Sequence, residues 1–179
     1  MTTHKIVITG GPGTGKTSII NKLKQSGQQC YPEISRDIIL EARKDGIEQL
    51  FTKDPLLFSQ KLLDGRIQQY KDAENAPEKT IFLDRGIPDI LAYMEFSGQK
   101  SPDAFVDACK SYRYSSIFLV PPWSEIHTTD NERYETFEQT ERIHQHLKAT
   151  YENLNYNCIL VPFGTVAERC NFILKNSIL

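Results

Sequence analysis

Short apolar runs recur along the chain, and longer polar stretches with helical periodicity separate them. Most of the runs are continuous rather than alternating, which is typical of strands that are covered on both faces. They predict strands at residues 5–9, 29–32, 80–83, 116–120 and 158–161. The intervening stretches predict helices at residues 16–25, 35–44, 55–73, 88–96, 102–111, 135–154 and 165–175. This alternation favours an α/β fold with helices on both sides of a parallel sheet.

The composition fits one globular domain over residues 1–179. A chain of 179 residues, 39% of them hydrophobic, can build a full hydrophobic core. Its 21 basic residues nearly cancel its 23 acidic ones, so no global positive field favours a nucleic acid backbone. No apolar run approaches the ~18 residues that a membrane-spanning helix requires. We therefore expect neither a nucleic acid partner nor a membrane partner.

Two further features predict a cytoplasmic protein. The cysteines are too far apart for a metal site and too few for a disulfide scaffold. The first residues lead straight into an apolar strand, without a charged and then apolar signal region. A reduced compartment is consistent with both observations.

A glycine-rich motif follows the first predicted strand and opens the first predicted helix. Residues 10–17 read GGPGTGKT and match the pattern G-x-x-x-x-G-K-[ST] of the Walker A loop. Glycines let backbone N–H groups turn toward a phosphate, and Lys16 adds a charge for the β- and γ-phosphates. The alternative is a glycine-rich turn with an ordinary surface lysine. The motif predicts that a nucleoside triphosphate binds Gly11, Pro12, Gly13, Thr14, Gly15, Lys16, Thr17 and Ser18.

An acid ends the third predicted strand. Asp84 occupies the position of a Walker B acid at the carboxyl edge of the sheet, so Asp84 and the hydroxyl of Thr17 are candidate Mg²⁺ ligands. Arg85 follows, where motor ATPases of the AAA type usually carry a glutamate that polarises water. Its guanidinium can stabilise phosphoryl oxygens, or Arg85 is a surface residue paired with Asp89. Asp89 is either a substrate-binding residue or a first-turn acid that favours the helix dipole.

Candidate acceptor residues follow the second predicted strand. Glu33 is expected to face the γ-phosphate and to receive the proton of an acceptor hydroxyl. Arg36, about one turn later, is expected to orient the acceptor. The alternative is that Glu33 only caps the helix that begins near residue 35.

Two segments near the carboxyl end of the sheet are candidates for nucleotide contacts. The polar stretch at residues 124–142 is a candidate lid, from which Arg133 would reach the phosphates. The alternative is a solvated loop whose charges compensate one another. Pro162 follows the fifth predicted strand and is placed to contact the base, although the neighbouring Phe163 can equally belong to the core.

Residues 10–17, 33–37, 83–86, 121–123 and 130–135 together resemble one family. The chain is similar to the AAA-type P-loop ATPase and kinase family that includes the ribosylnicotinamide kinase domain of NadR. This resemblance implies a P-loop three-layer fold with strand order 2-3-1-4-5, ATP with Mg²⁺, and phosphorylation of a nucleoside-like molecule. Some eukaryotic relatives are described as GTP-binding and regulatory, which implies a second class of function.

The sequence thus predicts an ATP-dependent kinase for an unidentified small-molecule acceptor. Lys16, Arg85 and Arg133 would stabilise charge on the transferred phosphoryl group, and Glu33 would accept the proton. The alternative is a nucleotide-dependent ATPase or GTPase switch that a protein partner reads. The acceptor, the base preference and the oligomeric state stay open.

Overall fold

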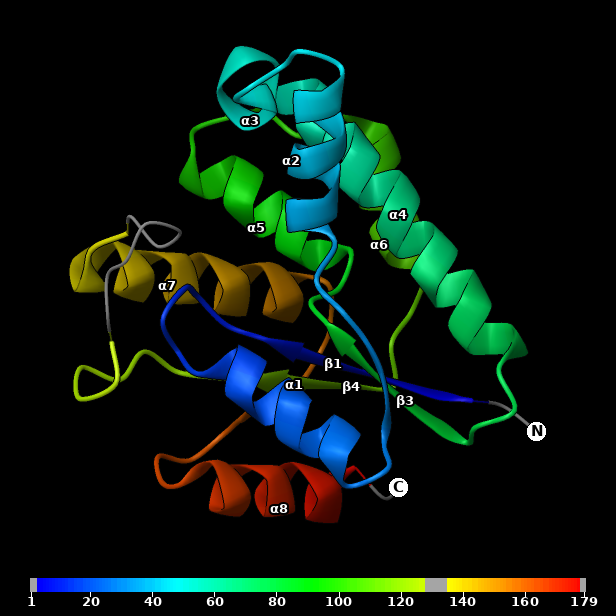
Figure 1. Ribbon diagram of the computed structural model, residues 1–179, viewed down its shortest axis with the longest axis vertical. Coiled ribbons are helices and arrows are strands. Elements are labelled where there is room, and N and C mark those ends of the chain that lie inside the picture. Colours follow the sequence, from blue (N-terminus) through cyan, green and yellow to red (C-terminus); the bar gives the residue numbers. More distant parts are fainter. Residues whose placement is uncertain (1–2, 128–134, 178–179) are drawn as a thin grey trace.

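The computed structural model describes residues 3–127 and 135–177, and it has three layers (Figure 1). Its described residues form one parallel sheet with the order β2-β3-β1-β4-β5, which the resemblance implied. The strands are β1 (His4–Thr9), β2 (Gln29–Tyr31), β3 (Thr80–Asp84), β4 (Ser116–Leu119) and β5 (Cys158–Leu160). The predicted α/β class and all five strands are confirmed, and each strand differs from its predicted range by one residue.

Helices cover both faces of this sheet. In the described part of the chain they are α1 (Lys16–Gln25), α2 (Ser35–Lys44), α3 (Leu50–Lys53), α4 (Pro55–Asn75), α5 (Pro88–Phe96), α6 (Asp103–Ser111), α7 (Phe137–Asn153) and α8 (Val166–Asn176). Helices α1 and α8 lie on one face, and α4, α5, α6 and α7 lie on the other (Figure 1). Helix α3 was not predicted, because four residues are too few to show helical periodicity. No helix among the described residues has the length and apolarity to cross a bilayer.

The two hydrophobic cores explain why the strands read as continuous apolar runs. Successive side chains of a strand point to opposite faces. Ile6 and Ile8 therefore pack in the core beneath α1 and α8, whereas Val7 packs in the core beneath α4, α5 and α6. All three are fully buried, so neither face of β1 is open to solvent there.

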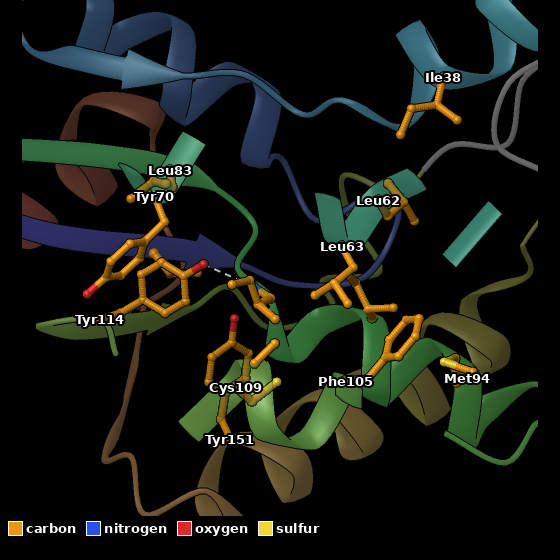
Figure 2. Close-up of a cluster of buried hydrophobic side chains, with 14 of the residues drawn as sticks. Ile38, Leu62, Leu63, Tyr70, Leu83, Met94, Phe105, Cys109, Tyr114 and Tyr151 are labelled. Atoms are coloured by element: carbon orange, nitrogen blue, oxygen red, sulfur yellow. Dashed lines mark hydrogen bonds between the residues drawn. The ribbon is translucent and has the colours of Figure 1, made fainter. Parts of the chain in front are cut away.

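Tyrosine hydroxyls connect the larger core to the loop that follows β3. Tyr70, Tyr114 and Tyr151 lie in this core (Figure 2). The Tyr114 hydroxyl accepts a hydrogen bond from the backbone N–H of Ile87 at 3.0 Å. The Tyr151 hydroxyl donates to Asp89 at 2.6 Å. The core thereby fixes the start of α5, which is next to the predicted site.

The parallel register brings the predicted site residues to one edge of the sheet. Ile8 lies opposite Asp84, and Thr9 lies opposite Leu119, so β1, β3 and β4 end together. The segments that leave these carboxyl ends carry the Walker A motif, Arg85 and the residues after β4. Such an edge is where α/β sheets bind their ligands.

Candidate functional site

The Walker A motif forms a loop that enters α1 as predicted. Gly13 and Gly15 have φ angles of 69° and 87°, which are left-handed conformations that favour glycine. Gly15 is the N-cap of α1, and Thr17 and Ser18 are exposed in the first turn of the helix. The α1 backbone thus presents its N-terminus at the loop, where the helix dipole favours a phosphate.

Lys16 lies across this loop rather than in solvent. Its side-chain Nζ donates a hydrogen bond to the carbonyl oxygen of Gly11 at 2.7 Å, and the residue is 8% exposed. The Thr14 hydroxyl donates to the same carbonyl oxygen at 2.9 Å. Burial and then Arg85 lower the pKa of Lys16, nearby carboxylates only partly oppose this change, and the resulting pKa is about 7. An anion bound at the loop would therefore strongly favour the charged form of Lys16.

Glu33 caps a helix, which was the alternative considered for it, and it also pairs with Arg85. Its Oε1 accepts hydrogen bonds from the backbone N–H groups of Ile34 and Ser35, both at 3.0 Å, and so caps the start of α2. Its Oε2 lies 2.5 Å from Nε of Arg85 as an ion pair. Burial raises the pKa of Glu33, but Arg66 and then Arg85 outweigh burial and lower this pKa to about 2. The carboxylate is therefore ionised and held at the site.

Arg85 contacts the phosphate loop and also pairs with Asp89. Its backbone is left-handed, with a φ of 75°, and its backbone N–H donates to the carbonyl of Ile8 at 3.1 Å. Its NH1 donates to the carbonyl of Gly10 at 3.2 Å and pairs with Asp89 at 3.4 Å. The pairing with Asp89 exists, but the side chain is 14% exposed, so Arg85 is not a surface arginine. A left-handed arginine costs about 1–2 kcal/mol, and such strain is common at functional sites.

Asp89 lies in the protein interior, next to the site. It is fully buried and accepts hydrogen bonds from the Thr9 hydroxyl at 2.5 Å, the Tyr151 hydroxyl at 2.6 Å and the Gly86 backbone N–H at 2.9 Å. These partners belong to β1, to α7 and to the loop after β3. A substrate could reach its carboxylate only by displacing them, so the placement favours a positioning role for Asp89 over the predicted substrate contact.

Asp84 and Thr17 fit the predicted Mg²⁺ site in their chemistry. Asp84 ends β3, and its partly buried carboxylate has one buried oxygen without a hydrogen-bond partner in the described structure. Burial raises the pKa of Asp84, and the charges of Lys16 and Arg85 oppose the rise. An unsatisfied carboxylate oxygen suits Mg²⁺ or one of its bound waters. The described residues contain no group of three or more metal-ligating side chains, so phosphate and water would supply most ligands.

The predicted lid at residues 124–142 is partly described. Residues 137–142 belong to α7, and Arg133 lies outside the described residues. His127 rests against the phosphate loop, because a Cβ at Gly13 would lie 2.6 Å from its Nδ1. The Thr140 hydroxyl donates to the carbonyl of Pro12 at 3.3 Å. Both described ends of this segment therefore contact the loop.

The remaining predicted residues, Arg36 and Pro162, lie at the same edge of the sheet and are exposed to solvent. Arg36 is exposed in the first turn of α2. Pro162 is exposed after β5, and the neighbouring Phe163 is 57% exposed, so Phe163 does not belong to the core. Its ring packs at a tilt of 35° against Trp123, with 5.2 Å between the ring centroids. The two rings form an aromatic surface beside the phosphate loop.

Two buried arginines at the site were not predicted. Arg66 of α4 is 4% exposed, donates to the carbonyl of Gly86 at 2.8 Å and pairs with Glu33 at 3.4 Å. Arg169 of α8 is 2% exposed and donates to the carbonyl of Thr14 at 2.8 Å. A cation on the apolar face of a helix was the available signal, since Arg66 lies one turn from buried Leu62.

The chain also matches a known protein family. Residues 5–169 match a family that is described as an AAA domain. This chain belongs to the AAA domain family. No curated protein matches this AAA domain.

Solved structures show which fold this AAA domain has. A deoxyadenosine kinase from M. mycoides with bound dCMP and dCDP matches with a TM-score of 0.69 and 17% identity, over 96% of this chain and 97% of that chain. NadR in complex with NR matches with a TM-score of 0.76 and 17% identity, over 98% of this chain and 51% of NadR. A thymidylate kinase from Ehrlichia chaffeensis matches with a TM-score of 0.67 and 13% identity, over 98% and 99%.

The AAA domain therefore has the P-loop fold that nucleoside and nucleotide kinases share. At these identities the likeness shows the fold alone. The AAA domain spans about half of the NadR chain. What it binds and transfers must be argued from its own residues.

Proposed function

We propose that this AAA domain is a kinase that transfers the γ-phosphoryl group of ATP to a hydroxyl of a small, nucleoside-like acceptor. The contact that carries this proposal is the ion pair between Glu33 and Arg85 beside the phosphate loop. It supplies a proton acceptor and a phosphoryl-binding cation at one place, which phosphoryl transfer needs. The nucleoside and nucleotide kinases among its structural neighbours support the same class of reaction.

The transfer step follows from these two side chains. The acceptor oxygen would attack the γ-phosphorus, the bond to the bridging oxygen of ADP would break, and Glu33 would take the hydroxyl proton. The pKa of Glu33 is about 2 while Arg85 pairs with it, which makes the carboxylate a weak base. When Arg85 turns to the phosphoryl oxygens, Glu33 loses a neutralising partner and becomes a stronger base. The proton would thus move when the phosphoryl group is in place.

The donor site would use the loop and its surroundings. Lys16 would exchange the Gly11 carbonyl for the β- and γ-phosphates, since a phosphate oxygen is the stronger acceptor. Thr17 and Asp84 would hold Mg²⁺ directly or through water, and the bound ion would neutralise phosphate charge. Arg133 is proposed to contact the phosphates, and Pro162 the base. We assign the remaining contacts with the donor to Gly11, Pro12, Gly13, Thr14, Gly15 and Ser18.

The acceptor site would lie on the side of Glu33 that faces α2. Arg36 lies in the first turn of this helix, about one turn from Glu33, and is proposed to orient the acceptor. Asp89 would act indirectly, because its contacts hold Arg85 and Gly86 in place. With these roles assigned to Arg36 and Asp89, Glu33 is the residue that would touch the reacting hydroxyl.

The replacement Glu33→Gln tests the proposal. We expect wild-type protein with Mg-ATP to release ADP faster when the correct nucleoside is added, in a screen of nucleosides and related metabolites. Glu33→Gln should lower this stimulated rate about 100- to 10,000-fold, the usual contribution of a general base, while the Kd for ATP stays within about threefold. Glu41→Gln removes an exposed carboxylate from α2, the helix that follows Glu33, and should keep wild-type activity.

The opposite result would favour the switch interpretation. If no acceptor raises ADP release above the basal rate, the kinase proposal fails. The protein would then act as a nucleotide-dependent module that a protein partner reads.

A further inference from the structure

Arg169 is a buried cation that contacts the phosphate loop from α8. It is 2% exposed, and its NH2 donates to the carbonyl oxygen of Thr14 at 2.8 Å. A Cβ placed on Gly15 would lie 2.7 Å from NH1 of Arg169. The guanidinium is therefore packed against the peptide group that joins Thr14 to Gly15.

Unlike the other buried arginines, Arg169 has no carboxylate among the described residues that balances its charge. Arg66 and Arg85 both pair with Glu33, whereas no described carboxylate lies within 4.0 Å of Arg169. Its Nε also has no hydrogen-bond partner among the described residues. A buried cation without a counter-charge is costly, and burial accordingly lowers the pKa of Arg169. A methionine of similar length would pack there at lower electrostatic cost, so packing alone does not account for an arginine.

The hydrogen bond to Thr14 reaches the phosphate-binding side of the loop through a single peptide group. In a trans peptide the C=O and the N–H point in opposite directions, and the structure has no cis peptide among its described residues. The N–H of Gly15 therefore points away from the guanidinium that bonds the carbonyl of Thr14. A cation on the carbonyl oxygen polarises the peptide and makes the N–H a stronger donor. The loop N–H groups are the ones that bind phosphate in a Walker A motif.

We infer that Arg169 is a positioning residue of the donor site, which fixes the Thr14–Gly15 peptide and strengthens the Gly15 N–H as a phosphate donor. The inference rests on the proposed function, because it takes the triphosphate of the donor as the anion at this loop. Arg169 itself acts through the peptide and does not touch the reacting atoms. It should affect the affinity for nucleotides more than the affinity for the acceptor.

The replacement Arg169→Met separates this role from simple packing. We expect the unliganded variant to keep its Tm within a few degrees of wild type or to exceed it, because the change removes an unpaired buried charge. Its Kd for Mg-ATP and Mg-ADP, measured by calorimetry, should rise about 10- to 100-fold, the range for a lost charge-assisted hydrogen bond. In kinetics the KM for ATP should rise while the KM for the acceptor is unchanged. Lys175→Met removes an exposed charge from α8 and should change none of these values.

Arg169→Lys keeps the charge and serves if the methionine variant does not fold. It should recover at least half of the lost affinity on a logarithmic scale, and the ¹H shift of the Gly15 amide should differ between Arg169→Lys and wild type. If folded Arg169→Met binds Mg-ATP with wild-type affinity while wild type also binds it, the inference is wrong and the proposed function stands. Where only Arg169→Lys folds, a Gly15 amide shift and a Mg-ATP affinity that both equal those of wild type overturn the inference. If wild type binds no Mg-ATP, the proposed function has failed instead.

Discussion

Burial makes the positive charge of Lys16 costly in the free protein, and a bound anion would offset this cost. Burial and, to a smaller extent, the nearby Arg85 lower its pKa to about 7. The carboxylates of Asp84, Asp89 and Glu33 limit this lowering. The site thus carries cations and anions in near balance, and a bound triphosphate would change that balance most strongly at Lys16. Binding at this residue should therefore be coupled to protonation.

The coupling gives a pH dependence with a definite sign. Unliganded Lys16 titrates near pH 7, whereas bound phosphate raises its pKa, so binding above pH 7 must take up a proton. Affinity for Mg-ATP should be constant below pH 7 and fall by up to about tenfold for each pH unit above it. Calorimetry at pH 8 in two buffers of different ionisation enthalpy should show uptake of nearly one proton. Lys16→Arg should abolish the uptake, and equal heats in both buffers for wild type would contradict the prediction.

Among single residues, the sequence predicts only those whose role follows from a motif. Lys16, Glu33 and Arg85 were found because each lies beside a predicted strand end or in a recognisable loop. Arg66 and Arg169 come from helices far away in the sequence and act through tertiary contacts with Gly86 and Thr14. Periodicity shows that each lies on a buried face, but no local pattern shows what it meets there.

The loop after β3 is held in place by elements that surround it. Arg66 of α4 bonds the carbonyl of Gly86, and Asp89 of α5 accepts its N–H. Tyr151 of α7 then bonds Asp89 at 2.6 Å. These contacts hold the left-handed backbone of Arg85, which would otherwise relax. Helix packing thus fixes Arg85, a proposed catalytic residue that lies outside the helices.

The replacement Tyr151→Phe tests this support from α7. It removes a single buried hydrogen bond and leaves the ring, so the free energy of unfolding should fall by about 1–2 kcal/mol. The loosened loop should also lower the stimulated kinase rate while Mg-ATP affinity is retained. Urea unfolding and steady-state kinetics measure the two effects. Tyr112→Phe, which removes a hydroxyl from the rim of the same core, should stay within about 0.5 kcal/mol of wild type. A Tyr151→Phe variant as stable and active as wild type would contradict the supporting role.

The bounds predicted from the sequence match the structure for some helices and differ for others. Helices α1, α2 and α5 have their predicted bounds. Helix α7 begins two residues later than predicted, because Thr136 and Gln139 form a capping box that fixes its start at Phe137. The rest of the predicted lid could not be resolved into helix and loop from polarity alone, since solvated helices and loops have similar composition.

Over the whole molecule, a nearly neutral composition hides a cluster of charges of both signs at one edge of the sheet. The formal net charge is only −2, yet Lys16, Arg66, Arg85 and Arg169 gather buried at one edge of the sheet. Glu33 and Asp89 pair with some of these cations, and the parallel topology brings all of them together. The predicted fold follows from strand order, but the cluster of charges depends on which helix faces are turned to this edge. The stability of the molecule should therefore depend on pH through this cluster.

Glu33 gives the clearest form of this dependence. Its pKa is about 2 in the folded protein against 4.5 as an ordinary glutamate, so its contribution to stability is complete above pH 4.5 and is lost as the pH falls toward 2. The contribution is at most about 3.5 kcal/mol, because each pKa unit corresponds to about 1.4 kcal/mol. Urea unfolding at several values between pH 5 and pH 3 should show a steeper loss of stability for wild type than for Glu33→Gln. Glu41→Gln should follow the wild-type curve, and parallel curves for wild type and Glu33→Gln would show that the ion pair with Arg85 contributes no net stability.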